Sequence, residues 1–112
     1  SFPKRIAYRA PDFDLASVGS LNFLKPDMIK FPHLQIACDA IETGGTAPCA
    51  LNASNEIAVE AFLNKKIRFL DMIKIIEKSL ENFIFVKNPK IEDYIRVDKQ
   101  SRIFSKQLIK NI

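Results

Sequence analysis

The chain has 112 residues and a formal net charge of +4, and 47% of its residues are hydrophobic while 27% are charged. This composition excludes a disordered chain, and a chain of this length buries about two-thirds of its unfolded surface in one core. No apolar run approaches the roughly 20 residues of a membrane span and no signal peptide opens the sequence, so we expect a cytoplasmic protein without a membrane partner.

Residues 1–31 are expected to be a mostly irregular linker, because proline interrupts every stretch that could form a long helix. The prolines are Pro3, Pro11, Pro26 and Pro32. Asp14 can cap a single helical turn over residues 15–18, and residues 20–24 can form a short extended segment. A segment of this kind needs another surface to lie across.

Residues 32–112 are expected to form an all-α domain, a small bundle of about four helices. The first helix should begin at Pro32, where the missing N–H does no harm, and end at Gly44 and Gly45, which accept the left-handed conformation. Its apolar side chains share one face that we expect to point inward. They are Leu34, Ala37, Cys38 and Ile41.

The second helix should be the central one. Thr46 is its expected N-cap, with the hydroxyl accepting a hydrogen bond from a free backbone N–H. One apolar face consists of Leu51, Ser54, Ile57, Ala58, Ala61 and Phe62. Val59 and Leu63 add apolar side chains on another side, so we expect this helix to be covered nearly all round.

Three polar residues lie within one turn of that helix: Asn52, Asn55 and Glu56. Burying such side chains is costly unless each polar atom has a partner, so we expect a buried, satisfied network that fixes the loops between helices. A role for Glu56 as a general acid or base is the weaker alternative, because no second titratable group accompanies it in the sequence.

The third helix is expected to be capped by Asp71, and the last helix by Asp98 after a break at Pro89 and a short turn over residues 91–95. The inward face of the third helix should contain Phe69, Met72, Ile73, Ile76, Leu80 and Phe83. In the last helix the inward residues should be Val97, Phe104, Leu108 and Ile112.

The two cysteines, Cys38 and Cys49, are expected to be reduced core thiols, since a disulfide scaffold would use more of them. A metal site is not expected, because His33 is the only histidine and no ligand cluster has the required spacing. The last helix carries a basic stripe of Lys99, Arg102, Lys106 and Lys110, which is either a solvated face or a site for an acidic partner. No aromatic side chain is interleaved for base stacking, so no nucleic-acid partner is expected.

Several segments resemble one enzyme family in order and at family spacing. The matching segments are Gly19–Phe23, Phe31–Pro32 with Leu34, Ile36 and Ala37, Gly44–Pro48, Leu51–Glu56, Ala58–Leu63 and Ile67–Ile73. They resemble deoxyxylulose phosphate reductoisomerase, the NADPH-dependent enzyme of the non-mevalonate isoprenoid pathway. The chain departs from the family pattern at Asn22, where the family has threonine, and at Ser54, where it has alanine.

The resemblance implies that this chain is the linker and carboxyl-terminal helical domain of a longer polypeptide, which its start at Ser1 also suggests. It further implies that the catalytic domain of the same polypeptide is its partner, that the parent is a homodimer, and that NADPH and Mg²⁺ or Mn²⁺ are bound elsewhere. No catalytic, cofactor-binding or metal-binding residue of the family is carried over. The alternatives are a free-standing helical module that binds an acidic partner through the basic stripe, or a fragment that self-associates.

Overall fold

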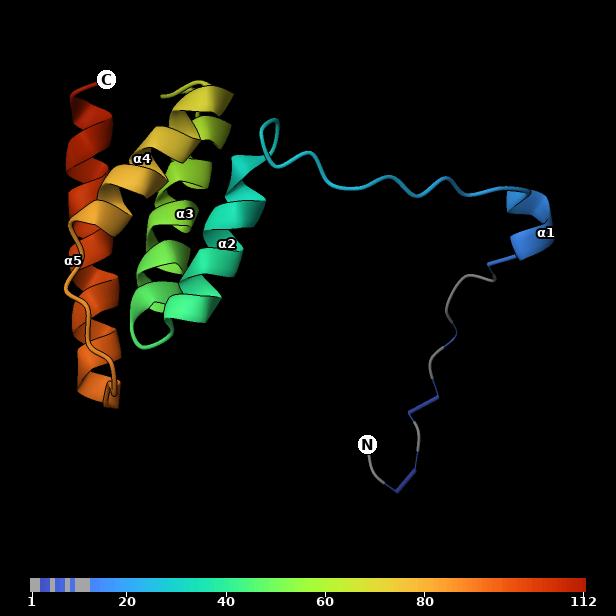
Figure 1. The fold of residues 1–112 in the computed structure, drawn as a ribbon, viewed down its shortest axis with the longest axis horizontal. Coiled ribbons are helices and arrows are strands. Elements are labelled where there is room, and N and C mark those ends of the chain that lie inside the picture. The colour runs from blue at the N-terminus through green and yellow to red at the C-terminus, as the bar shows by residue number, and fades with distance from the viewer. Residues whose placement is uncertain (1–2, 5, 8, 10–12) are drawn as a thin grey trace.

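The computed structural model describes residues 3–4, 6–7, 9 and 13–112. Its elements are α1 (Leu15–Val18), α2 (Pro32–Thr43), α3 (Ala47–Leu63), α4 (Phe69–Glu81) and α5 (Ile91–Lys110). Helices α2 to α5 form a bundle, and the segment that carries α1 extends away from it (Figure 1). The expected all-α fold is confirmed, and the described part of the chain contains no strand.

The described part of the linker forms the expected single turn. The Oδ1 atom of Asp14 accepts a hydrogen bond from the backbone N–H of Ala16 at 3.0 Å, and this bond caps α1. Every residue from 13 to 31 is exposed, including the irregular piece at 20–24. Pro11 lies outside the described residues. The described part of the linker therefore does not lie against the bundle.

Helix α3 is the central helix, as expected, because it packs against α2, α4 and α5 (Figure 1). Small side chains along it, with Ala50, Ala53 and Ala58 fully buried, let the neighbouring helices approach closely. The main core cluster consists of Ala58, Ala61, Ile67, Met72, Ile75 and Ile76, with partly buried Ile36, Leu51, Phe62, Leu80, Leu108 and Ile109 packed around it.

The predicted inward face of α2 is wrong. The helix packs through Ile36, which contacts the core cluster, and through Ala40, its one buried residue. Leu34 and Ile41 remain 45% and 73% exposed, and Cys38 is exposed as well. Helix α2 has apolar side chains on two adjacent faces, and periodicity alone cannot tell which of the two meets the core.

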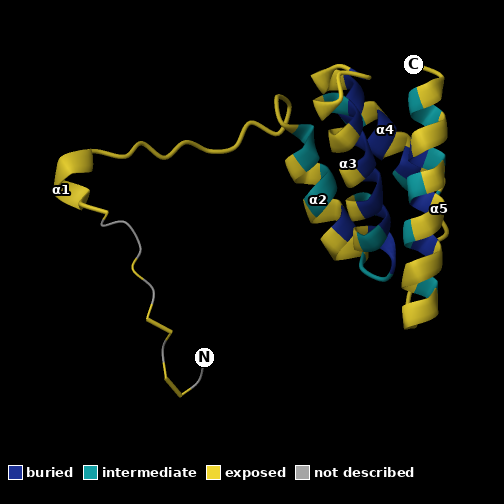
Figure 2. Cartoon of the chain, turned by 180° about the vertical axis from the view of Figure 1, so that it is seen from behind, coloured by how far each residue is buried: buried dark blue, intermediate teal, exposed yellow. Residues whose placement is uncertain are grey.

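The expectation that α3 is covered nearly all round is also wrong. Val59 is 37% exposed and Leu63 is 71% exposed, although the opposite side of the helix is buried (Figure 2). Among the described residues three helices pack on α3, and together they leave this side open. An apolar side of a central helix is thus exposed in this chain.

Two helix starts differ from the prediction. Helix α4 begins at Phe69, so Asp71 caps it from its third residue, where its carboxylate accepts the backbone N–H of Arg68 at 3.1 Å. Helix α5 begins at Ile91 because Asp93 plays the same part for the N–H of Lys90 at 3.0 Å. Asp98, predicted as a cap, therefore lies inside a continuous helix.

The inward faces of α4 and α5 are partly as predicted. Met72, Ile76 and Val97 are buried, whereas Phe69 and Ile112 are 54% and 64% exposed. The buried residues that the pattern missed are Ile75, Ser79, Ser101 and Ser105. Serine in a closely packed helix interface has no hydrophobic signature, so the periodic pattern could not find it. No helix in the described residues is long and apolar enough to cross a membrane.

Candidate functional site

The Gly44–Gly45–Thr46 turn joins α2 and α3 to the connection between α4 and α5. A Cβ atom on Gly45 would lie 2.3 Å from the carbonyl oxygen of Val86, and the residue has a φ of +54°. Only glycine meets both conditions without strain. The glycine therefore allows the two connections to touch at one end of the bundle.

Thr46 completes this contact. It is fully buried, and its hydroxyl donates to the carbonyl oxygen of Ile84 at 3.1 Å and accepts from the N–H of Val86 at 2.9 Å. Thr46 is the N-cap of α3, as predicted, but its hydroxyl makes no capping bond within the helix. The predicted role is thus wrong, because the side chain satisfies a distant loop instead.

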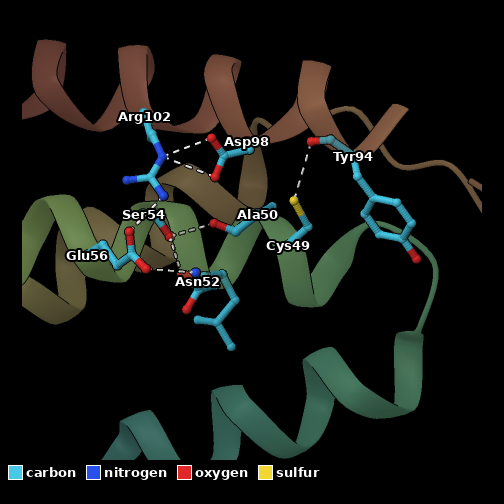
Figure 3. A network of polar contacts seen from close by, with 9 residues as sticks. Cys49, Ala50, Asn52, Ser54, Glu56, Tyr94, Asp98 and Arg102 are labelled. Carbon is cyan, nitrogen blue, oxygen red and sulfur yellow. Dashed lines mark hydrogen bonds and ion pairs between the residues drawn. The ribbon is translucent and has the colours of Figure 1, made fainter. Parts of the chain in front are cut away.

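A polar network connects α3 to α5 (Figure 3). The Asn52 amide donates to Glu56 at 3.0 Å, and Arg102 donates to the other Glu56 oxygen at 2.7 Å. The Arg102 Nε atom also donates to both carboxylate oxygens of Asp98, at 2.9 and 3.0 Å. Asn52 and Glu56 are exposed, so the expected buried network that fixes loops is instead an exposed clamp between two helices.

The electrostatics of this network disfavour Glu56 as an acid or base. The hydrogen bond from Arg102, with a second from Asn52, lowers the pKa of the Glu56 carboxyl below its ordinary value. A general base works best when its pKa lies near the operating pH. Glu56 is instead held as a carboxylate that pairs with Arg102.

Cys49 lies beside this network, with its Sγ atom 3.5 Å from the carbonyl oxygen of Tyr94. Burial, followed by the nearby charge of Asp98, raises the pKa of the Cys49 thiol. The thiol is therefore poorly ionised and is not an activated nucleophile. Both cysteines are free, but the expectation that both are core residues fails for Cys38, which is exposed.

The basic stripe is interrupted by the same network. Arg102 is engaged by two carboxylates, and its side chain is only 31% exposed. Lys99, Lys106 and Lys110 are exposed. The most central cation of the stripe is thus already paired, which weakens the alternative of a site for an acidic partner.

No group of three or more histidine, cysteine, aspartate or glutamate side chains in the described residues could hold a metal ion. The carboxylates of the described network are each engaged by an arginine, as in the pairs that Arg102 forms with Glu56 and Asp98. The donor set of the described residues thus does not fit a divalent metal.

A groove of about 400 Å³ lies between α2 and α3. Its lining includes His33, Ala37, Ile41, Pro48, Asn52 and Asn55, and no lysine, arginine, aspartate or glutamate lines it. Pro48, which follows the glycine turn, and the two asparagines Asn52 and Asn55 thus border a hollow without charged side chains.

Comparison with protein-family models gives a match to the DXP reductoisomerase C-terminal domain over residues 1–104. Among curated proteins, the 1-deoxy-D-xylulose 5-phosphate reductoisomerase of Halothermothrix orenii is 43% identical over 108 residues, covering 96% of this chain and 28% of that protein. The enzyme of the same name from Zymomonas mobilis is 38% identical over 112 residues, covering 100% of this chain and 29% of that protein.

Solved structures show the same similarity. The Zymomonas mobilis reductoisomerase in complex with NADPH has a TM-score of 0.86 and 39% identity, covering 99% of this chain and 29% of that one. A DOX-P reductoisomerase in complex with NADPH, fosmidomycin and magnesium has a TM-score of 0.85 and 35% identity, covering 98% of this chain and 29% of that one. The chain thus spans less than a third of the length of these relatives.

Proposed function

Because this chain belongs to the family of the DXP reductoisomerase C-terminal domain, we propose that it is the scaffold domain of such an enzyme. The parent protein then converts 1-deoxy-D-xylulose 5-phosphate to 2-C-methyl-D-erythritol 4-phosphate, with NADPH as the hydride donor. The observation that carries this proposal is the match over residues 1–104, together with 43% identity to the Halothermothrix orenii reductoisomerase.

The described residues do not supply the chemistry themselves. Their carboxylates form no cluster for a divalent metal, and the one carboxylate of the asparagine motif is paired with Arg102. We therefore place the NADPH and the Mg²⁺ or Mn²⁺ sites in the part of the polypeptide outside this chain. The metal would polarise the substrate oxygens there, and this chain would hold the geometry of the catalytic part.

We propose the division of this chain into a linker at residues 1–31 and a bundle domain at residues 32–112. The exposure of every residue from 13 to 31 supports this division, since the bundle buries none of them. The catalytic domain of the same polypeptide is the proposed surface for the linker. The parent is proposed to be a cytoplasmic homodimer with no nucleic-acid or membrane partner, and light scattering of the full-length protein would test the dimer.

The activity is tested by following NADPH absorbance with 1-deoxy-D-xylulose 5-phosphate and Mn²⁺. The full-length protein should oxidise NADPH, and the 112-residue chain at the same concentration should give the blank rate. Failure of the full-length protein to turn over would overturn the proposed reaction. Turnover by the 112-residue chain alone would overturn its role as a scaffold.

A further inference from the structure

A hollow of about 460 Å³ lies between α3 and α5. The turn between α3 and α4 and the carboxyl end of α5 lie at the same end of the bundle, and both contribute to its lining (Figure 1). The charged residues of the lining are Lys66 of the turn, Lys106 and Lys110 of α5, and Glu60 of α3. We call this hollow the lysine pocket and define it by these four residues.

The three lysines of this pocket take part in none of the ion pairs of the described residues. Lys106 and Lys110 are four residues apart on one helix, and neighbouring like charges at this spacing destabilise a helix slightly. The negative end of the α5 dipole favours Lys110 in the last turn, but it does not explain Lys66, which comes from another segment. The lining has three lysines and one carboxylate, so two positive charges are in excess.

A second hollow at this end of the bundle shows a different arrangement of charge. It has a volume of about 370 Å³, and it is lined by Arg68 and Lys74 of the α4 region and by the end of α5. Both cations pair with Asp71 there, at 2.9 and 3.5 Å. The chain thus supplies an anion to the cations of the second hollow and leaves those of the lysine pocket without one.

The turn that positions Lys66 is strained. Lys65, directly before it, is the one non-glycine residue in the described part of the chain with a positive φ, at +58°. The N–H of Lys66 donates to the carbonyl oxygen of Ala61 at 2.9 Å, which holds Lys66 beside a residue of the pocket lining. Glycine would relieve the strain at position 65, and backbone strain clusters at binding sites and switch regions. The lysine there adds a further cation next to the pocket.

The floor of the lysine pocket is apolar. It consists of Ile57 and Ala61 of α3, each 5% exposed, and the partly buried Ile109 of α5. Inorganic phosphate would meet the lysines and leave this floor uncovered. A hydrocarbon group attached to the phosphate would cover it, and each methylene that it buries there should tighten binding up to about fourfold. The pocket therefore fits an anion that carries an apolar group.

The excess charge indicates which anion fits. A phosphate monoester carries a charge of about −1.5 to −2 at neutral pH, which balances two positive charges, whereas a single carboxylate balances one. The cations in the lining are all lysines, whose ammonium groups bind phosphate as point charges, and no arginine supplies the planar fork that matches a carboxylate. A phosphate monoester thus agrees with both the amount and the type of charge.

We propose that the lysine pocket binds a soluble organic phosphate, with the phosphate group on Lys66, Lys106 and Lys110 and the apolar group on the floor. This inference goes beyond the proposed function, because the pocket has no part in the proposed reaction. It also divides the basic stripe of α5. Arg102 is paired within the bundle, and the two lysines that follow it form a site with a lysine of another segment.

The test is calorimetric titration of the full-length enzyme with hexyl phosphate at pH 7 in a phosphate-free buffer. Inorganic phosphate and hexanol are the probes that each lack one half of the ligand. The variant Lys106→Gln/Lys110→Gln removes two cations of the pocket. The matched control is Lys78→Gln/Lys99→Gln, which changes the net charge equally at two exposed lysines outside the pocket. Any binding of hexyl phosphate to the catalytic part is common to all these proteins.

We expect the parent and the control variant to bind hexyl phosphate with equal Kd, at least ten times tighter than inorganic phosphate or hexanol. The pocket variant should bind it at least ten times more weakly, and Glu60→Gln should bind it about threefold more tightly because it removes the one carboxylate of the lining. Circular dichroism spectra of the variants should match that of the parent, so that a loss of binding is not a loss of fold.

The inference is overturned if the pocket variant binds hexyl phosphate as the control does, if inorganic phosphate binds as tightly, or if no binding is measured. Phosphatidylcholine vesicles with 20% phosphatidic acid test the other source of a phosphate monoester. Sedimentation of the parent with these vesicles, lost in the pocket variant, would place the phosphate on a membrane and overturn the soluble ligand. NADPH turnover is measured in parallel, and its absence in the parent would remove the proposed function without changing the result for the pocket.

Discussion

Thr46 and Val86 are 40 residues apart in the sequence and are joined by two hydrogen bonds. The backbone N–H of Thr46 donates to the Val86 carbonyl oxygen at 3.1 Å, and the N–H of Val86 donates to the Thr46 hydroxyl at 2.9 Å. This pair connects the α2–α3 turn to the α4–α5 connection. The start of the central helix is thereby held by the opposite half of the bundle.

The substitution Thr46→Val tests this connection. It keeps the shape of the side chain but leaves the N–H of Val86 without its acceptor, so we expect a loss of about 1–3 kcal/mol in the free energy of unfolding. Urea denaturation followed by circular dichroism measures the change. Thr46→Ser keeps the hydroxyl and should retain most of the stability. Equal stabilities for the two variants would contradict the role of the hydroxyl.

Gly45→Ala should destabilise the same junction for a different reason. Its Cβ atom would meet the Val86 carbonyl oxygen at 2.3 Å, and its φ of +54° is unfavourable for alanine. The backbone strain and the overpacking together should cost about 2–4 kcal/mol. Gly19→Ala is the control, because its φ is also positive but nothing lies within 4 Å of the new Cβ. Equal shifts of the urea midpoint for the two substitutions would show that the close approach of Gly45 to Val86 does not contribute to the loss of stability.

Lys65→Gly is expected to stabilise the chain. Lys65 has a φ of +58°, and the N–H groups of Lys65 and Lys66 donate to the carbonyl oxygens of Phe62 and Ala61. This arrangement is a Schellman motif, in which glycine is the favoured left-handed residue, so the gain should be about 0.5–1 kcal/mol. Lys66→Gly, one residue later, is the control. It does not relieve the positive φ at Lys65, so it should not stabilise the chain. A fall in the urea midpoint for Lys65→Gly would argue against the motif.

Asp71→Asn should reduce stability in a pH-dependent way. The hydrogen bond from the Arg68 side chain, followed by one from its backbone N–H, lowers the pKa of Asp71 from 3.8 to about 2. Because the folded pKa is the lower one, this stabilisation is present above pH 3.8 and is lost as the pH falls toward 2. The urea midpoints of the parent and the variant should differ at pH 7 and converge near pH 2. A constant difference would show that Asp71 acts without its charge.

The sequence predicted the helices better than it predicted their contacts. Pro32 and Gly44 bound α2 as expected, because both residues restrict the backbone locally. The choice between Leu34 and Ile36 as the core residue of α2 depends on neighbours that are distant in sequence, and the choice was wrong. Local chemistry thus sets the ends of a helix, whereas its orientation depends on tertiary packing.

The polar residues illustrate the same division. The motif of Asn52, Asn55 and Glu56 was predicted to form a buried network that fixes loops, and this prediction was wrong. Asn52 and Glu56 instead form an exposed network with Arg102, which is 46 residues from Glu56 and could not be read from the pattern. The basic stripe was defined by the spacing of cations along one helix. This spacing could not predict that the carboxylate of Glu56, on α3, pairs with one of those cations. The open side of Val59 and Leu63 was missed because apolar side chains on a second side of a helix predict burial in the sequence, whereas the number of helices that pack on it depends on the tertiary structure.

Ser79 and Ser105 form a hydrogen bond of 2.8 Å between two buried hydroxyls at the contact of α4 and α5. Replacing either serine with alanine leaves one buried hydroxyl unpaired, which should cost about 1–3 kcal/mol. Replacing both removes the unpaired group, so the double variant Ser79→Ala/Ser105→Ala should be more stable than the sum of the single losses implies. Urea unfolding of the four proteins of this cycle measures the coupling. Additive losses would show that the two hydroxyls do not depend on each other for satisfaction.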